Sequence, residues 1–310
     1  MAANRANFAD LLTPGFRKIF DDAFNEVPMV MDSIFHVETS SKDTEKDSGV
    51  TGFGLAQVTA EGAPIDYEDP IQMYDTTYTH IKYTKGFKVT REAVDDDLYR
   101  IFGKKPGNLA RAMRRTAEYQ AAQVFNRGFN SSYLGGDGQE LFSTVHPRSD
   151  AGTSQSNASS TGITLSETNL ETARIAFRQQ LDDKGMVIDV NPNVLLVPTN
   201  LEKTAHLIVD STMRQGTADN DANFYKDKFQ VKVWRYLDAG ATGGSATAWF
   251  LLDTSQHQLT WFWRERPQFK NDELFDTEYA VYKSTMRLSR GWSDWRGVWG
   301  SKGDGSAYSG

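Results

Sequence analysis

Apolar residues recur every three or four positions in the segment that follows Thr13. This stripe consists of Phe16, Ile19, Phe20, Ala23 and Phe24. With Thr13 placed to cap it and Pro14 at its first position, the pattern predicts an amphipathic helix over residues 14–27, ended by Pro28. A short helix cannot bury such a stripe by itself. We therefore expect the helix to dock on the chain's own core or on a neighbouring molecule.

Residues 50–89 have the pattern of two long strands joined through a turn at residues 61–64, whereas the polar segment 38–49 before them predicts an irregular connection. The second strand is the clearer one. One of its faces carries Ile81, Tyr83, Phe87 and Val89. A hairpin with so few core-sized residues near its tip is not stable alone, so we expect it to project and to pack elsewhere.

The longest helical pattern in the chain runs from Asn108, a predicted N-cap, to about Gly128. Its apolar residues fall on one side of the helix. Arg111, Arg114 and Arg115 fall mostly on the other side. This segment is therefore expected to be a long helix with a basic outer face.

Shorter elements are predicted on both sides of this helix. Thr90, Ser166 and Thr199 each precede a helical pattern, and the apolar run 194–197 predicts a buried strand. Further strands are expected at residues 229–237, 248–263 and 279–300. The small polar residues of the segment 301–310 give no reason for order.

Composition narrows the class of protein. The chain has 310 residues, enough for one large or two ordinary domains whose core needs no disulfide or metal. It has no cysteine, which excludes disulfides, iron–sulfur clusters, thiolate zinc sites and a cysteine nucleophile. The net charge of -7 argues against a dedicated nucleic-acid binder. Because we find no signal peptide and no apolar stretch of about 20 residues, we expect no membrane association and a reducing cytoplasm.

Residues with catalytic or metal-binding chemistry are scattered. The five histidines lack ligand-pair spacing, and the segment at Asp219 that begins like a calcium loop lacks the required glycine and glutamate. We therefore predict no catalytic residue, no cofactor and no metal. The enzymatic alternative is a soluble hydrolase that uses His146 with a carboxylate. Ser143 stands three positions before it, but in a proline-bounded loop and not in a strand–elbow–helix.

Four stretches of the chain, taken in order, carry a resemblance to a known family. The first is GLAQVTAEGAPIDYEDP followed by YTKGFKVTREAVDDDLY, and the second is LFSTVHP. The third is NVLLVPTNLEKTAHLIVDS, and the fourth is AVYKSTMRLSRGWSDWRGVWGS. In this order and spacing they resemble the major capsid proteins of tailed bacteriophages, and most closely the major head subunit family of Mu-like phages.

The resemblance implies an α+β protein with the Hong Kong 97 capsid fold. Such a fold has an N-terminal arm, an extended hairpin called the E-loop, a peripheral domain with a long spine helix, and an axial domain. The implied segments are the arm at 1–49, the E-loop at 50–89, the peripheral domain at 90–163 and 251–310 with the spine helix at 108–128, and the axial domain at 164–250.

The resemblance also implies a function. It predicts a non-enzymatic shell protein that self-assembles into hexamers and pentamers and forms an icosahedral head around double-stranded DNA. We expect it in the virion, after assembly in the cytoplasm of the bacterial host. The implied partners are other copies of the chain, a separate scaffold protein, a portal protein, a cement or decoration protein, and packaged DNA bound without sequence specificity.

Some relatives cross-link their subunits through a lysine of the E-loop. No lysine lies between Lys46 and Lys82, so we expect a non-covalent shell. Some relatives also lose a long N-terminal segment to a protease. Only about fifty residues precede the hairpin here, so we expect no such cleavage.

Charge around the predicted hairpin suggests how subunits meet. Residues 61–75 carry five acids and no base, whereas residues 82–91 carry four bases and no acid. We hypothesise that the acidic hairpin tip faces the basic spine helix of a neighbour. The expected interface residues are Phe16, Phe20, Phe24, Ile65, Asp66, Tyr67, Glu68, Asp69, Arg111, Arg114 and Arg115.

Three alternatives remain open beside this prediction. One is an encapsulin-like nanocompartment shell with the same fold, which would enclose an enzyme instead of a genome. Another is the hydrolase that uses His146. The third is a tail or adaptor component, which would form rings or tubes.

Overall fold

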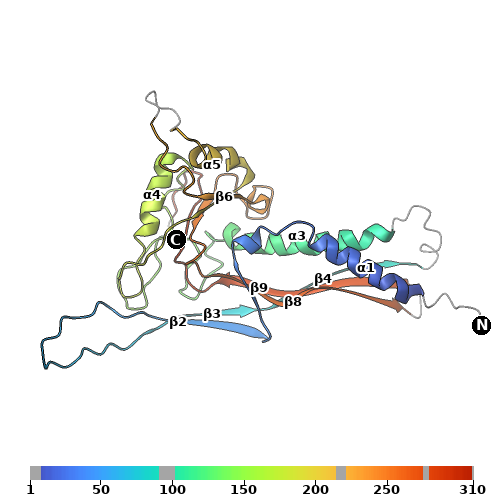
Figure 1. The fold of residues 1–310 in the computed structure, drawn as a ribbon, viewed down its shortest axis with the longest axis horizontal. Helices are drawn as coiled ribbons and strands as arrows, with labels where there is room; N and C mark the ends of the chain where they lie inside the picture. The colour runs from blue at the N-terminus through green and yellow to red at the C-terminus, as the bar shows by residue number, and fades with distance from the viewer. Residues whose placement is uncertain (1–7, 91–101, 214–220, 275–278, 309–310) are drawn as a thin grey trace, which may run out of the picture.

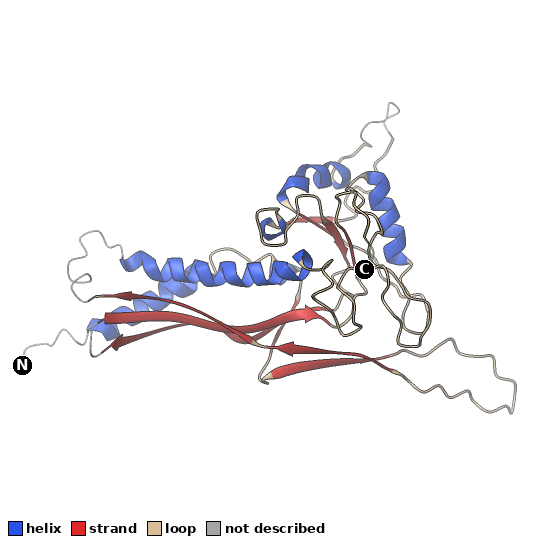
Figure 2. Ribbon diagram, turned by 180° about the vertical axis from the view of Figure 1, so that it is seen from behind, coloured by secondary structure: helices blue, strands red, loops and turns tan. Residues whose placement is uncertain are grey.

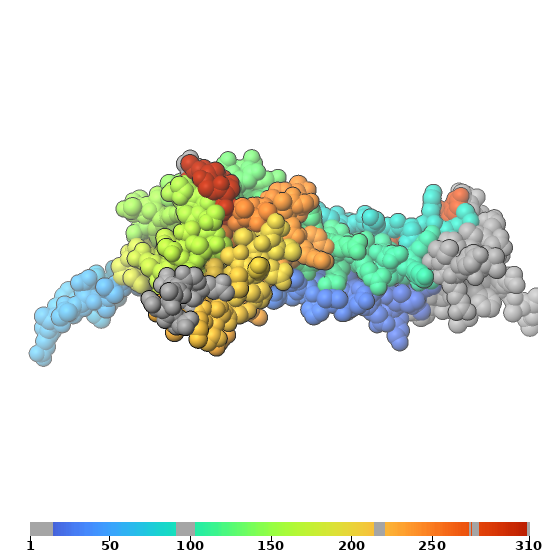
Figure 3. Space-filling view, turned by 90° about the horizontal axis from the view of Figure 1, so that it is seen from above, coloured from blue at the N-terminus to red at the C-terminus, as the bar shows by residue number. Residues whose placement is uncertain are grey.

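The computed structural model describes residues 8–90, 102–213, 221–274 and 279–308. Within them, the chain forms an elongated body built on one long sheet and a second body at one end of it (Figure 1). A two-stranded hairpin runs beneath both bodies and ends in a loop that projects beyond them (Figure 1). Figure 3 shows this loop standing clear of the rest of the molecule.

The elongated body is a four-stranded sheet covered on one face by two helices (Figure 2). Its strands, in spatial order, are β1 (His36–Thr39), β8 (Leu259–Leu274), β9 (Tyr279–Trp292) and β4 (Ile81–Val89). Within this sheet β1 and β8 pair in parallel, and the other neighbouring strands pair antiparallel. The helices that pack on the sheet are α1 (Phe8–Phe24) and α3 (Lys105–Asn126).

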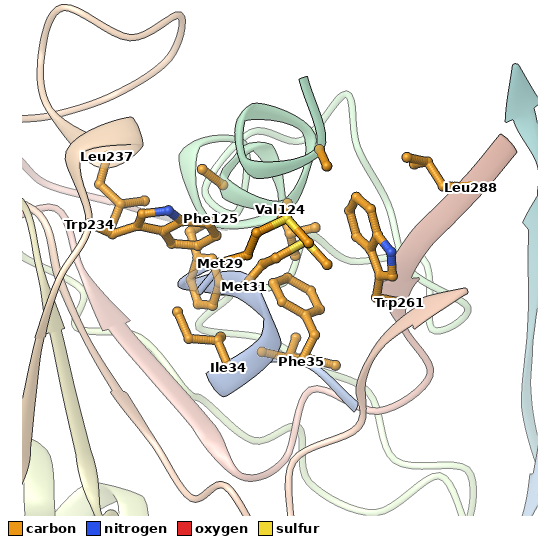
Figure 4. Packing of buried hydrophobic residues seen from close by; sticks show 14 of the residues in the cluster. Met29, Met31, Ile34, Phe35, Val124, Phe125, Trp234, Leu237, Trp261 and Leu288 are labelled. Carbon is orange, nitrogen blue, oxygen red and sulfur yellow. The ribbon is translucent and has the colours of Figure 1, made fainter. Parts of the chain in front are cut away.

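The core of this body lies between the helices and the sheet. Met31 and Phe35, from the segment after α1, gather with Trp261 of β8 beneath α3 (Figure 4). Because side chains alternate along a strand, β9 contributes Met286 and Leu288 to the same core. Each fully buried side chain of this size contributes roughly 1.5–3 kcal/mol.

Both helices start earlier than predicted. In α1, the prediction of a start at Thr13 is wrong, because the helix begins at Phe8. The apolar period of the sequence continues upstream through Phe8, Leu11 and Leu12, so Thr13 lies inside the helix and does not cap it. In α3 the helix begins at Lys105 and not after Asn108, because Pro106 is well suited to a first turn.

The hairpin differs from the predicted one. It consists of β2 (Thr44–Val50) and β3 (Gln72–Thr79), joined by the long loop 51–71. The segment 38–49 is thus largely strand, and residues 81–89 belong to the large sheet, where β4 pairs with β9. The prediction missed β2 because nearly all of its residues are polar, as suits a ribbon with no buried face.

The second body is built on another four-stranded sheet, with its own core. Its strands, in spatial order, are β10 (Val298–Ser301), β7 (Trp249–Leu252), β5 (Val194–Val197) and β6 (Gln230–Val233). Its helices are α4 (Glu167–Arg178) and α5 (Glu202–Val209). The predicted buried strand 194–197 and the cap of α4 are confirmed, since the Ser166 hydroxyl accepts the Asn169 N–H at 3.2 Å.

Short 3-10 turns and the chain end complete the fold. The turns are η2 (Met31–Ser33), η3 (Phe102–Lys104), η4 (Thr199–Leu201) and η5 (Arg235–Leu237). β10 joins the second sheet, although the resemblance placed it in the peripheral domain. The expectation of a disordered end is wrong up to Tyr308, whose hydroxyl contacts Glu140 and donates to the Phe142 carbonyl at 2.7 Å. The helix expected after Thr90 lies outside the described residues.

Candidate assembly surfaces

The loop 51–71 is the most exposed apolar segment of the described chain. Ile65 is 68% exposed and Tyr67 is 87% exposed, and Phe53, Leu55 and Val58 are also uncovered. Soluble monomers rarely leave a contiguous set of large apolar side chains in water. The loop therefore has the character of a surface that another molecule covers.

The acidic residues predicted for this loop divide into two groups. Asp66 and Asp69 are exposed, as is Glu61, and the described residues offer them no ion pair. Glu68 instead forms an ion pair with Lys184 of the second body at 2.6 Å and accepts the Gly54 N–H at 2.7 Å. These two contacts lower the pKa of Glu68, with the Lys184 contact the larger cause. Three acidic side chains thus remain available to a partner.

The arginines predicted to receive that loop are partly engaged within the chain. Arg111 forms an ion pair with Glu26 at 3.1 Å, and Arg114 donates to the Pro28 carbonyl at 3.1 Å. Both therefore anchor the segment after α1 to the surface of α3. Arg115 is exposed. The structure thus leaves less free positive charge on α3 than the sequence suggested.

The phenylalanine stripe docks on the chain's own core, which is the first of the two expected alternatives. Phe20 is 1% exposed and packs against Phe269 with ring centroids 5.5 Å apart. Phe24 is also buried, and Phe16 is half-buried against Tyr282 at 5.7 Å. In this conformation the chain itself covers Phe20 and Phe24, and their assignment to a subunit interface stays a prediction.

A basic groove lies on the open face of the large sheet, away from α1 and α3. Lys82 of β4 stands directly opposite Arg287 of β9, and Lys270 of β8 stands opposite Lys283 of β9. These four basic side chains line a groove of about 450 Å³. Glu265 is the one carboxylate among the residues that line it. Like charges directly opposite each other destabilise a sheet. An acidic partner in the groove would relieve this repulsion.

The sequence shows the basic residues of this groove but not their arrangement. Lys82 lies in the basic run 82–91, and Lys283 and Arg287 lie in a second basic stretch near the end of the chain. What the pattern does not reveal is the register that places them side by side. That register follows from the pairing of β9 with both β4 and β8.

His146 and Ser143 are fully buried and form part of a polar cluster. The ring nitrogens of His146 lie 2.6 Å from an Asp137 carboxylate oxygen and 3.0 Å from the Asn157 amide oxygen. The ring also stacks on Trp295 with centroids 4.4 Å apart. Ser143 is buried too, and its hydroxyl accepts the Val145 N–H. The cluster joins distant parts of the long connection between α3 and α4 to Trp295, in the connection between β9 and β10. It gives a hydrolase neither an accessible nucleophile nor an accessible base.

The described ranges contain neither a metal-binding cluster nor a membrane-spanning helix. No three acidic, histidine or cysteine side chains in residues 8–90, 102–213, 221–274 and 279–308 come together as metal ligands would. No helix in that part of the chain is long and apolar enough to cross a membrane.

Comparisons with known proteins agree with this arrangement. The family model for phage capsid protein matches residues 74–301, nearly three quarters of the chain. No curated protein matches the sequence.

Solved structures with a similar fold include capsids. The JBD30 bacteriophage procapsid chain is 19% identical with a TM-score of 0.51, and the match covers 95% of this chain and 75% of that one. The chain from a JBD30 capsid decorated with minor capsid protein trimers is 17% identical with a TM-score of 0.57. The match covers 77% of this chain and 100% of that one. The capsid chain of a native GTA particle is 12% identical with a TM-score of 0.58, and the match covers 92% of each chain. The family match and the fold together identify the chain as a member of the phage capsid protein family, a major capsid protein of the virion with the Hong Kong 97-type fold.

Proposed function

We propose that the chain is the subunit of an icosahedral phage head, which assembles from hexamers and pentamers and encloses double-stranded DNA. The observation that carries this proposal is the projecting loop 51–71, whose exposed apolar side chains have no cover on the chain itself. Only a neighbouring molecule can bury them, and in a shell of identical subunits that neighbour is another copy. The chain's role in this proposal is structural, without catalytic activity.

We further propose that the loop docks on the basic groove of a neighbour and not on its spine helix. Asp66, Asp69 and Glu61 would meet Lys82, Lys270, Lys283 and Arg287, which would relieve the like-charge repulsion across β9. Complementary charge of this kind guides association and fixes register. The spine helix is the weaker candidate because two of its three arginines, Arg111 and Arg114, already have partners within the chain. Of the four basic groove residues, Arg287 has such a partner, Asp43 at 3.7 Å.

The shape of the subunit supports a head-to-tail contact. The loop leaves one end of the long axis, the sheet extends toward the other end, and both the hairpin and the open sheet face lie away from α1 and α3 (Figures 1 and 2). Copies placed side by side in the same orientation can therefore lay each loop across the next sheet. Such heterologous contacts close into rings when the rotation allows it.

Two matched triple variants test the docking surface. One reverses the groove with Lys82→Glu, Lys270→Glu and Lys283→Glu, and the other reverses the helix at Arg111, Arg114 and Arg115. Both are produced with the neighbouring head genes, checked for folding by circular dichroism, and examined by electron microscopy. We expect the groove variant to lose closed shells and the helix variant to keep them. The opposite result would restore the spine helix as the docking surface, and normal shells from both would refute charge-guided docking.

The contents of purified shells test the remaining part of the proposal. Double-stranded DNA is expected, held through phosphate contacts without sequence specificity. A protein cargo instead would indicate a nanocompartment, and rings or tubes would indicate a tail or adaptor component. A separate scaffold protein, a portal and a cement protein are the partners we propose for assembly in the bacterial cytoplasm.

A further inference from the structure

A single ion pair joins the projecting loop to the second body among the described residues. The Lys184 ammonium lies 2.6 Å from a Glu68 carboxylate oxygen, and the Lys184 side chain is only 15% exposed. The other Glu68 oxygen accepts the N–H of Gly54, on the opposite leg of the loop, at 2.7 Å. Glu68 therefore ties both legs of the loop to one point on the second body.

The turn that carries Lys184 is itself firmly built. One Asp182 carboxylate oxygen accepts the N–H groups of Lys184 at 2.8 Å and Met186 at 2.7 Å. Gly185 has a φ of 75°, and a Cβ at this position would lie 3.0 Å from the Arg148 guanidinium. A residue with a larger side chain would be strained here. The ammonium of Lys184 thus projects from a rigid support.

A buried ionic contact fixes the turn from below. Asp183 is 4% exposed, accepts the Ser149 N–H at 3.1 Å, and pairs with Arg296 at 3.2 Å. Arg296 also pairs with Asp294 at 3.0 Å. Removing one partner of a buried pair leaves an unpaired charge, so such a contact strongly resists rearrangement. The turn and the body beneath it therefore move as one unit.

Beyond this point the loop has no comparable support. From Leu55 to Tyr67 the residues are exposed. A segment of this length without cover samples many directions unless its base is held. Thr51 and Ile71 join the two legs at the base of the loop by hydrogen bonds of 2.8 and 2.9 Å. The Glu68–Lys184 contact adds the ion pair that links these legs to the second body.

We propose that Lys184 is a positioning residue for assembly: through Glu68 it sets the direction in which the loop 51–71 leaves the subunit. This inference rests on the proposed docking of the loop on a neighbour. A loop held in its docking direction loses less conformational entropy on binding, so it associates faster and more tightly. Lys184 lies outside the docking surface itself and acts only through the loop.

The test measures amide hydrogen exchange in the loop of the unassembled subunit. In Lys184→Gln we expect the Gly54 amide and its neighbours to exchange about two- to fivefold faster, the scale of one surface ion pair. We expect shell formation, followed by light scattering, to slow by a similar factor. Lys226→Gln, which removes an exposed lysine elsewhere on the second body, is the matched control and should change neither value.

A conservative variant separates positioning from a general effect on folding. Lys184→Arg keeps a positive charge beside Glu68 and leaves the Glu68 carboxylate able to accept the Gly54 N–H, so we expect both exchange and assembly rate to stay close to wild type. Unchanged exchange in Lys184→Gln, or an effect of Lys184→Arg as large as that of Lys184→Gln, would overturn the inference. If wild type itself forms no shell while exchange still responds to Lys184, the proposed function fails and the positioning role stands.

Discussion

Replacing Glu118 by glutamine should weaken the joint between the two bodies. Glu118 lies in the middle of α3 and is 5% exposed. One carboxylate oxygen accepts the Val30 N–H at 2.6 Å, and the other accepts the indole N–H of Trp234 at 2.7 Å. The side chain thus connects α3 with the segment after α1 and with the turn before η5.

The cost of the substitution follows from the two donors. Glutamine has one acceptor oxygen, so in Glu118→Gln either Val30 or Trp234 faces an NH2 group and loses its partner. A buried hydrogen bond to a charged group contributes about 1.5–3 kcal/mol. Part of this loss is offset because a neutral amide is less costly to bury, the same burial that raises the pKa of Glu118. We expect a net destabilisation of about 1–2 kcal/mol, a large share of a typical stability of roughly 5–15 kcal/mol.

Urea unfolding of the unassembled subunit measures this effect, with Trp234→Phe as the companion variant. Trp234→Phe removes one of the two donors, so Glu118→Gln should cost less in that background than in wild type. The pH dependence gives a second readout. Since the native pKa of Glu118 is raised, its contribution to stability is full below the unfolded pKa and is lost as pH rises through the native value. Equal stability of wild type and Glu118→Gln at all pH values would refute the reasoning.

Three further predictions concern other parts of the chain. Burial, and next the charge of a neighbouring histidine, lower the pKa of His257 to about 4 from 6.5, so stability should fall by about 3 kcal/mol as pH drops through that interval. His257→Gln should reduce this loss, as judged by urea midpoints at about pH 7 and about pH 4.5. Gly303→Ala should destabilise more than Gly305→Ala, because both have positive φ but only at Gly303 would the methyl group meet a backbone carbonyl, at 1.9 Å; thermal melts compare them. Denaturing gels of virions should show single subunits without covalent ladders, since no lysine lies between Lys46 and Lys82.

The elements that the sequence predicted well are those with a strong apolar period or run. The strand 194–197 is apolar throughout, and the sequence alone marks it as buried. The stripe containing Phe20 likewise marks a buried helix face. In both cases the local sequence pattern predicts the same buried residues that the tertiary packing covers.

The parts that the sequence missed depend on pairing between distant segments. β2 is polar on both faces and becomes a strand only because β3 pairs with it. The end of the chain is ordered because the Tyr308 hydroxyl contacts Phe142 and Glu140. These residues are too far from Tyr308 in the sequence for a local pattern to predict the contact. The same limit applies to the candidate site: the exposed loop could be predicted from its charges, but the basic groove could not, because the strand register creates it.

The late position of β8, β9 and β10 in the chain has a consequence for synthesis. β9 lies at the centre of the first sheet, and β10 completes the second. More than 160 residues separate Asn126, at the end of α3, from Trp292, at the end of β9. At about 5–20 residues per second, the ribosome exposes the apolar faces of α1 and α3 for roughly 10–30 s before the central strand of their sheet exists. The nascent chain is therefore a natural client for chaperones during this interval, and a chain that stops before β9 cannot form a subunit able to enter a shell.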